Sequence, residues 1–199
     1  MKISIISTSQ RKNSQSSRIA KIIENFIAEI DSNLIISRID MFDLRIPLWT
    51  SEKEQNKIFW EKRWNQISSD LKSSDGFIYV VPEYGGMATP NSKNFFLLCN
   101  KGELSHKPGL LISISSGNGG SYPISELRSS SYKNTHIMWI PENIIIRNVE
   151  QFSPGNHGEL IPKWLDARIK YSCNLLTKYA HYLKPIQKII NRKDFGNGM

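Results

Sequence analysis

The sequence has few cysteines, and this scarcity excludes a disulfide framework. Its 199 residues contain only Cys99 and Cys173. Neither has another Cys or a His nearby at the spacing of a zinc site, so a structural zinc site is not expected either. Both cysteines lie in segments with helical patterns, and we expect them to be reduced, partly buried thiols.

The sequence also lacks a long apolar run. No run approaches the roughly 18 residues that cross a bilayer as a helix. Near the N-terminus, Lys2 and Arg11 bracket only a strand-length apolar segment, whereas a secretory signal has a longer uncharged stretch. We therefore expect a cytoplasmic protein with no membrane partner.

Positive charge is abundant, with a formal net charge of +8. The segment 184-KPIQKIINRK-193 carries a concentrated share of it. Aromatic residues are not interleaved with this basic stretch and no nucleic-acid-binding motif is present, so nucleic acid is not an expected partner. The favoured interpretation is a basic surface that tolerates phosphorylated small molecules.

Strand-like and helix-like patterns alternate through most of the chain. The segment 76-GFIYVV-81 is apolar on both faces, as expected of a parallel strand covered by helices on both sides. The pattern predicts one α/β domain over residues 1–184 and a basic, partly disordered tail over residues 185–199. Predicted strands are 3–7, 34–39, 76–81, 109–115 and 136–140, with a further apolar piece at 143–149; predicted helices are 19–30, 53–75, 91–99, 123–132 and 160–183.

Three loops with unusual chemistry follow predicted strands. In a parallel α/β sheet, ligands bind outside the carboxyl ends of the strands. The first loop, 7-STSQRKNSQSS-17, has no glycine and a surplus of hydroxyl groups. Hydroxyl groups, the amides at the start of the following helix and the charge of Arg11 could together hold a phosphate. The alternative is an ordinary loop in which Ser14 or Ser16 only caps the helix.

The second and third loops could address a planar ligand. In 82-PEYGGMATP-90, the two glycines expose backbone groups that can reach the edge of a heterocycle, and Tyr84 could pack beside it. In 115-SSGNGGS-121, flexible backbone could line the other side of the same ligand. Considered separately, each loop could equally be a simple turn, but their placement at one sheet edge favours a shared site.

Three ordered motifs in these loops resemble the NADPH-dependent FMN reductase family over roughly residues 2–150. They are 8-TSQRKNSQS-16, 82-PEYGG-86 followed by Lys93 and Asn94, and 115-SSGNGG-120. The chain differs from the family pattern in having Thr8 in place of a glycine, Gly85 in place of an asparagine, and Ser116 and Asn118 in the third motif.

The resemblance implies a flavodoxin-like three-layer sandwich with a five-stranded parallel sheet in the order 2-1-3-4-5. It also implies bound FMN, NAD(P)H as co-substrate, a small-molecule electron acceptor such as a quinone, and a homodimer or homotetramer. No catalytic side chain is implied, because the flavin itself accepts the hydride. The cofactor-binding residues that it implies are Ser9, Arg11, Ser14, Gln15, Ser16, Pro82, Glu83, Tyr84, Gly85, Ser115, Ser116, Gly117 and Gly120.

Some alternatives stay open at this stage. A divergent binding or regulatory module with weak or no reductase activity would carry the same motifs, and a flavodoxin-like electron carrier is a less favoured third reading. His106, His136 and His181 are expected on the surface, whereas His157 could fold over the ligand edge. Trp49 follows a predicted strand and could stack on the ligand.

Overall fold

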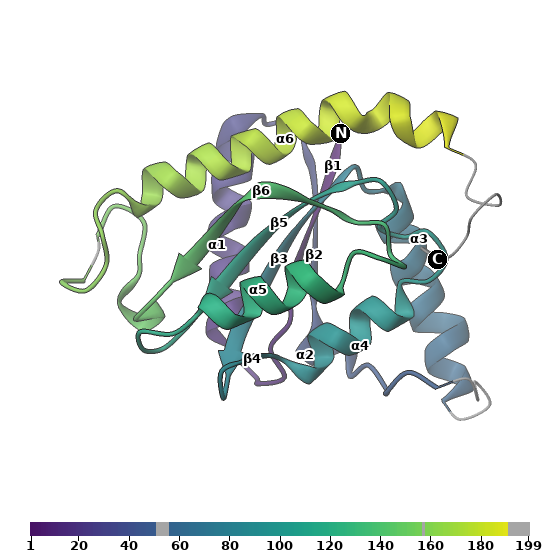
Figure 1. The fold of residues 1–199 in the computed structure, drawn as a ribbon, viewed down its shortest axis with the longest axis horizontal. Coiled ribbons are helices and arrows are strands. Elements are labelled where there is room, and N and C mark those ends of the chain that lie inside the picture. Colours follow the sequence, from purple (N-terminus) through teal and green to yellow (C-terminus); the bar gives the residue numbers. More distant parts are fainter. Residues whose placement is uncertain (51–55, 157, 191–199) are drawn as a thin grey trace.

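The computed structural model describes residues 1–50, 56–156 and 158–190, which form a parallel sheet between two layers of helices (Figure 1). The strands are β1 (Lys2–Ser7), β2 (Ile35–Asp40), β3 (Gly76–Tyr84), β4 (Met87–Ala88), β5 (Pro108–Ile114) and β6 (Met138–Ile146). The sheet has six strands rather than the five predicted. The short β4 pairs antiparallel with β3, and the other five strands are parallel in the order β2-β1-β3-β5-β6, so the predicted order holds once β4 is set aside.

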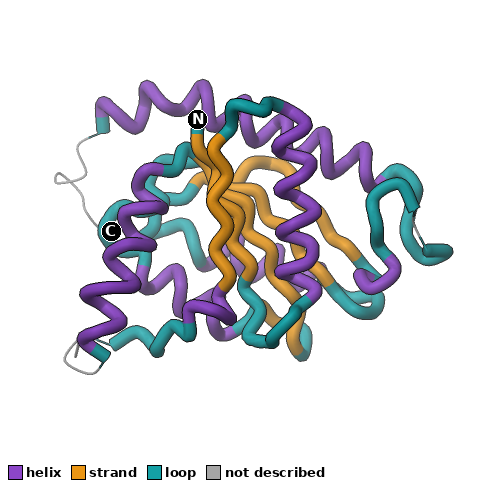
Figure 2. Tube along the Cα trace, turned by 180° about the vertical axis from the view of Figure 1, so that it is seen from behind, coloured by secondary structure: helices purple, strands orange, loops and turns teal. Residues whose placement is uncertain are grey.

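The helices divide between the two faces of the sheet (Figures 1 and 2). Residues of α1 and α6 share one hydrophobic core with the sheet, and residues of α3, α4 and α5 share a second core on its other face. The helices are α1 (Gln15–Ile30), α2 (Met41–Leu44), the π-helix η1 (Phe59–Trp64), α3 (Asn65–Ser73), α4 (Pro90–Leu98), α5 (Ser121–Ser130), the 3-10 helix η2 (Val149–Gln151) and α6 (Leu165–Ile189).

Periodic apolar residues explain both cores. Ile19, Ile23 and Ile27 of α1 are fully buried on one helix face, as their spacing of four residues requires. In β3, Phe77 and Tyr79 enter the core shared with α4, while Ile78 and Val80 enter the core shared with α1 and α6. Side chains of a central strand alternate between two covered faces, which is why this strand is apolar throughout.

One predicted boundary was wrong near the end of the sheet. Most of the apolar pieces 136–140 and 143–149 belongs to a single strand, β6 (Met138–Ile146), which contains Pro141. The pairing register between β5 and β6 shifts between Gly109 and Leu111. The carbonyls of Ile140 and Glu142, on either side of Pro141, accept hydrogen bonds from the Arg128 guanidinium at 2.6 and 3.0 Å, so the strand continues past the irregularity with these groups satisfied.

The last helix was predicted over residues 160–183, and it both begins and ends later than that. Helix α6 begins at Leu165 and ends at Ile189, with Pro185 inside it. Its final turns are held by an ion pair between Lys184 and Asp75, 3.0 Å apart, and by the Gln187 side-chain amide, which donates to the His106 carbonyl at 3.4 Å. The first residues of the expected tail are therefore helical, and residues 191–199 lie outside the described part of the chain.

The two cysteines are fully buried, more than the partial burial expected. Cys173 lies in α6 and Cys99 follows α4, and both are free thiols. Burial raises the pKa of Cys99 well above its ordinary value and that of Cys173 to about 12. A thiol that stays protonated is a poor nucleophile and metal ligand, so both cysteines act as small apolar core residues.

A buried charged group lies at the amino ends of the strands. Lys107 is 6% exposed, and its ammonium group donates to the carbonyls of Leu71, Lys72 and Glu103 at 2.9, 2.8 and 3.0 Å. Two of these carbonyls belong to the last turn of α3, where a helix has unpaired acceptors and a negative dipole end. Lys107 therefore caps α3 and links it to the loop before β5.

Among the described residues, no helix is both long and apolar enough to cross a membrane.

Candidate functional site

The three predicted loops meet in a cavity of about 350 Å³ at the carboxyl ends of β1, β3 and β5. Every residue of the implied cofactor site lines this cavity except Gly117 and Gly120. The lining residues are Ser9, Arg11, Ser14, Gln15, Ser16, Pro82, Glu83, Tyr84, Gly85, Ile114, Ser115, Ser116, Val149 and Glu150. The volume lies within the usual range for small-molecule sites.

The start of α1 forms one end of the cavity. Ser14 is the N-cap of this helix, and its hydroxyl accepts a hydrogen bond from the Ser17 N–H at 3.1 Å. Ser16 is different, because its side chain is 1% exposed and its hydroxyl has no hydrogen-bond partner. An unpaired buried hydroxyl is costly, and here it lies at the positive end of a helix dipole. This arrangement fits a phosphate group.

Two contacts join the first loop to the second. The Ser9 and Tyr84 hydroxyl groups are 2.7 Å apart, and the Arg11 guanidinium lies over the Tyr84 ring, 4.8 Å from its centroid. The Arg11 backbone N–H also donates to the Ser9 hydroxyl at 3.1 Å. The basic group of the first loop is thus held at the cavity by an aromatic ring of the second loop.

The third loop supports Glu83 rather than only lining the cavity. The Gly120 N–H donates to the Glu83 carboxylate at 2.7 Å. Gly120 has a φ of +103°, and a Cβ at Gly119 would lie 2.3 Å from a carboxylate oxygen of Glu83. Glycine is therefore required at this turn for a close approach of backbone to side chain. Gly117 lies outside the cavity, and its N–H donates to the Ser115 hydroxyl at 3.2 Å.

Thr8, which replaces a family glycine, does not enter the cavity. Its side chain is fully buried below the loop. Its hydroxyl accepts a hydrogen bond from Ser92 at 3.0 Å, and its carbonyl accepts one from Thr89 at 2.9 Å. Thr89 is the N-cap of α4, so this hydroxyl cluster ties the first loop to the helix that follows the second loop. The Cβ of Thr8 therefore leaves the phosphate end of the cavity open.

A fourth wall of the cavity was not predicted from the sequence. It consists of Val149 and Glu150, which follow β6. Arg18 of α1 holds this wall by donating to the carbonyls of Val149 and Phe152 at 2.5 and 2.8 Å. Burial lowers the pKa of Arg18, with the carboxylate of Glu150 acting in the opposite direction. The sequence did contain one signal for this wall: its residues come after a strand and therefore lie at the carboxyl edge of the sheet.

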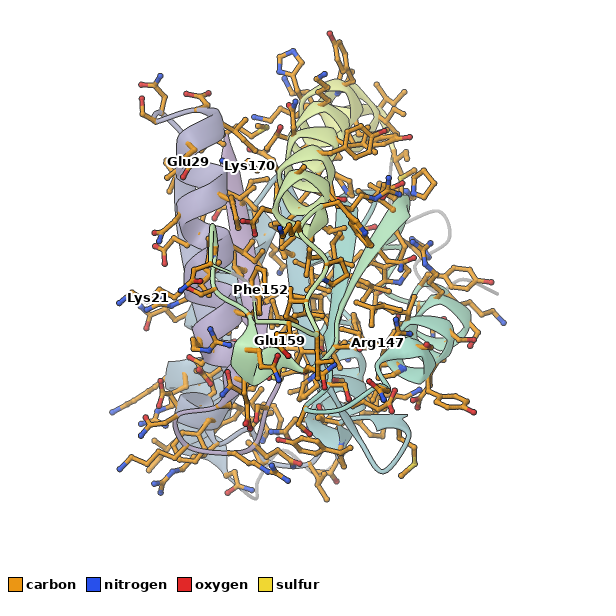
Figure 3. All side chains as sticks on the ribbon, turned by 90° about the vertical axis from the view of Figure 1, so that its left-hand side faces the viewer. Lys21, Glu29, Arg147, Phe152, Glu159 and Lys170 are labelled. Carbon is orange, nitrogen blue, oxygen red and sulfur yellow. The ribbon has the colours of Figure 1, made fainter. Side chains whose placement is uncertain are left out.

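Figure 3 views the molecule from the side of η2 and labels Arg147 and Phe152, which belong to the segment that follows β6. Arg147, from the same segment, donates to the carbonyls of Asn118 and Gly119 at 2.7 and 3.0 Å. The segment after β6 is therefore joined both to α1 and to the third loop, which encloses the cavity from the side of η2.

The described histidines and Trp49, which lie outside the three motifs, do not line this cavity. The rings of His106 and His136 are 5.2 Å apart, just before β5 and β6 and so at the opposite edge of the sheet. His181 is exposed on α6, and His157 lies outside the described residues. Trp49 is 47% exposed and lines a separate small cavity. Within the described ranges, no group of acidic, His and Cys residues could hold a metal ion.

A larger cavity of about 860 Å³ lies along the edge strand β2. Its walls carry groups of both charges and include Arg38, Asp40, Arg63 and Asp70. It is distinct from the predicted site, and none of the described residues that line it is a buried polar group without a partner. The candidate site is therefore chosen by the chemistry of the loops and not by the size of the cavity.

Comparisons with solved structures show the same fold. An oxidoreductase from Corynebacterium diphtheriae has a TM-score of 0.72 and 17% identity, covering 91% of this chain and 97% of that chain. A flavoenzyme NAD(P)H:(acceptor) oxidoreductase from Paracoccus denitrificans has a TM-score of 0.70 and 14% identity over the same shares. A flavodoxin from the domain Archaea has a TM-score of 0.55 and 14% identity, covering 92% of this chain and 99% of that chain.

No curated protein sequence matches the chain significantly. The sequence model of the family described as NADPH-dependent FMN reductase, however, matches residues 1–151, a span that contains all three loops and the fourth wall up to Gln151. The chain therefore belongs to the NADPH-dependent FMN reductase family and is an FMN-dependent oxidoreductase whose cofactors are FMN and NAD(P)H.

Proposed function

We propose that the protein is an NAD(P)H oxidoreductase that reduces flavin, quinone or similar small acceptors with FMN held in the cavity between the three loops. The observation that carries this proposal is Ser16, whose buried hydroxyl has no partner and lies at the start of α1 on the cavity wall. A phosphate at this place would satisfy that hydroxyl and would gain from the helix dipole and from Arg11.

Each loop has a distinct part in this proposal. Ser9, Arg11 and Ser16 would hold the phosphate, and the segment 82–85 and Ser115 would hold the flavin ring. Bound FMN would supply the chemistry, because the flavin accepts a hydride and passes electrons on. The protein would orient the ring, exclude water from it and keep its edge within reach of backbone donors. We also propose that the enzyme is a cytoplasmic homodimer or homotetramer built from one domain that extends to the end of α6 at Ile189.

An absorbance spectrum tests the cofactor and the reaction together. Purified protein that has been incubated with FMN and freed of excess flavin is expected to be yellow, and to bleach when NADPH or NADH is added without oxygen. A quinone added afterwards should restore the colour. Yellow protein that does not bleach would instead support a binding module without reductase activity, and colourless protein would overturn the proposed site.

Replacing Ser16 with alanine is expected to weaken FMN binding about 10- to 100-fold, because a hydrogen bond to a charged phosphate is lost. The matched control is Ser17→Ala, because the side chain of Ser17 lines the separate cavity beside β2. Fluorescence titration with FMN measures both dissociation constants. Equal affinities for the two variants would show that the phosphate does not lie at Ser16.

A further inference from the structure

The outer face of α6 carries a row of exposed apolar side chains. We call it the outer stripe, and it consists of Trp164, Tyr171, Tyr179, Tyr182, Ile186 and Ile189. The residues are separated by three, four, seven or eight positions, a spacing that returns to one side of a helix. Tyr182 is 75% exposed and Ile189 is 81% exposed.

The opposite face of α6 is already used by the core. Ile169, Cys173, Leu176 and Ala180 are fully buried against the sheet. Figure 1 shows α6 along the upper border of the molecule, with no other described helix or strand over its outer side. The helix has 25 residues, which corresponds to a length of about 38 Å. The outer stripe is therefore a long apolar surface that the described chain leaves uncovered, and such surfaces mark interaction sites.

The charge around the outer stripe is positive. Helix α6 contains Arg168, Lys170, Lys178, Lys184 and Lys188 but a single acidic residue, Asp166. Three of these groups are balanced by neighbouring elements: Lys170 pairs with Glu29 of α1 at 3.0 Å (Figure 3), Arg168 with Glu142, and Lys184 with Asp75. The remaining basic groups of the helix are Lys178 and Lys188. By their spacing, Arg168 and Lys178 lie within the outer stripe itself.

This charge selects the kind of partner. Two copies of the same face would bring like charges together, which disfavours a second copy of this chain. A single-stranded nucleic acid could stack on the tyrosines but would gain nothing from Ile186 and Ile189. Tryptophan and tyrosine are favoured at the boundary between lipid and water, isoleucine at the apolar side of it, and long basic side chains reach from there to anionic headgroups.

We propose that the outer stripe of α6 docks the protein reversibly on anionic lipid surfaces, with the helix axis parallel to the surface. This contact requires no helix that spans the bilayer. The sequence alone suggested no membrane partner, because the stripe becomes visible only once the buried face of α6 is known. One consequence rests on the proposed function: acceptors that dissolve in lipid, such as quinones, would be concentrated at the docked enzyme.

Co-sedimentation with lipid vesicles tests the proposal. The full-length protein is expected to sediment with vesicles of equal parts phosphatidylcholine and phosphatidylglycerol, and much less with phosphatidylcholine alone. The double variant Tyr182→Ser/Ile189→Ser should reduce the vesicle-bound fraction about tenfold, because two apolar anchors are removed. The matched control is Tyr122→Ser/Leu48→Ser, since these residues are 68% and 75% exposed and lie outside α6.

Three results would overturn the proposal. The first is equal binding of both double variants to the mixed vesicles, and the second is no binding of the unchanged protein. The third is a change in oligomeric state of the Tyr182→Ser/Ile189→Ser variant without lipid, seen by analytical ultracentrifugation, because the stripe would then be a contact between copies. The vesicle assay involves no electron transfer, so its outcome is independent of whether the reductase function is correct.

Discussion

Replacement of Lys107 by alanine is expected to lower the free energy of unfolding by about 3 kcal/mol or more. The variant would leave the carbonyls of Leu71, Lys72 and Glu103 without the donor that now pairs with all three. Each buried acceptor left unpaired costs about 1 to 3 kcal/mol. Urea denaturation followed by tryptophan fluorescence measures the change. The matched control is Lys133→Ala, because Lys133 is exposed, and its effect should stay within about 0.5 kcal/mol.

The cost of the Lys107 replacement should also depend on pH. Burial lowers the pKa of Lys107 from 10.5 to about 8 in the folded protein. Between these two values the unfolded chain binds more protons at this residue than the folded chain, so this residue makes stability rise with pH there. The Lys107→Ala variant lacks this contribution. The difference in unfolding free energy between the two proteins should therefore grow from pH 8 to pH 10, and a difference that stays constant or shrinks would contradict the assigned burial.

Replacement of Gly120 by alanine is expected to weaken FMN binding by about 100-fold, with a loss of stability of about 1 to 3 kcal/mol. A side chain at this residue would be strained by the φ of +103°, and its Cβ would lie 2.6 Å from a methyl group of Ile145. The third loop would have to move, and the Glu83 carboxylate would lose the Gly120 N–H that now fixes it.

Gly117 provides the control in the same loop. A Cβ at Gly117 would meet no atom within 4 Å, and its φ lies outside the left-handed region. The Gly117→Ala variant should bind FMN as the unchanged protein does, when both are compared by fluorescence titration and thermal unfolding. If the two variants were equally impaired, the whole loop would need glycine for flexibility, and the specific contact with Glu83 would not explain the effect.

The sequence was sufficient to predict the parallel sheet and the position of the cavity. Strands such as β3 are apolar on both faces, and the rule that ligands bind at the carboxyl ends of such strands needs no atomic detail. The short β4 was missed because two residues after a double glycine give no periodic signal. The continuation of α6 past Pro185 was missed because tertiary contacts of Lys184 and Gln187 override the usual effect of proline.

Details of the cavity depended on contacts that join distant parts of the chain. The sequence shows only that Thr8 replaces a glycine of the family pattern, not where its side chain lies. The structure directs its side chain toward Thr89 and Ser92, which are more than 80 residues away. Arg18 lies near the start of α1, beside the first loop, but two of its hydrogen bonds go to carbonyls that follow β6. Sequence patterns report local periodicity and cannot report such pairs.

The irregularity at Pro141 has a consequence for the solubility of the protein. Strand β6 is the last strand on its side of the sheet, and a regular outer strand offers a row of free amide and carbonyl groups on which another chain can polymerise. Proline removes one of the amides, and the shifted register interrupts the even repeat that a growing fibril would need. The irregularity around Pro141 thus protects this border against aggregation.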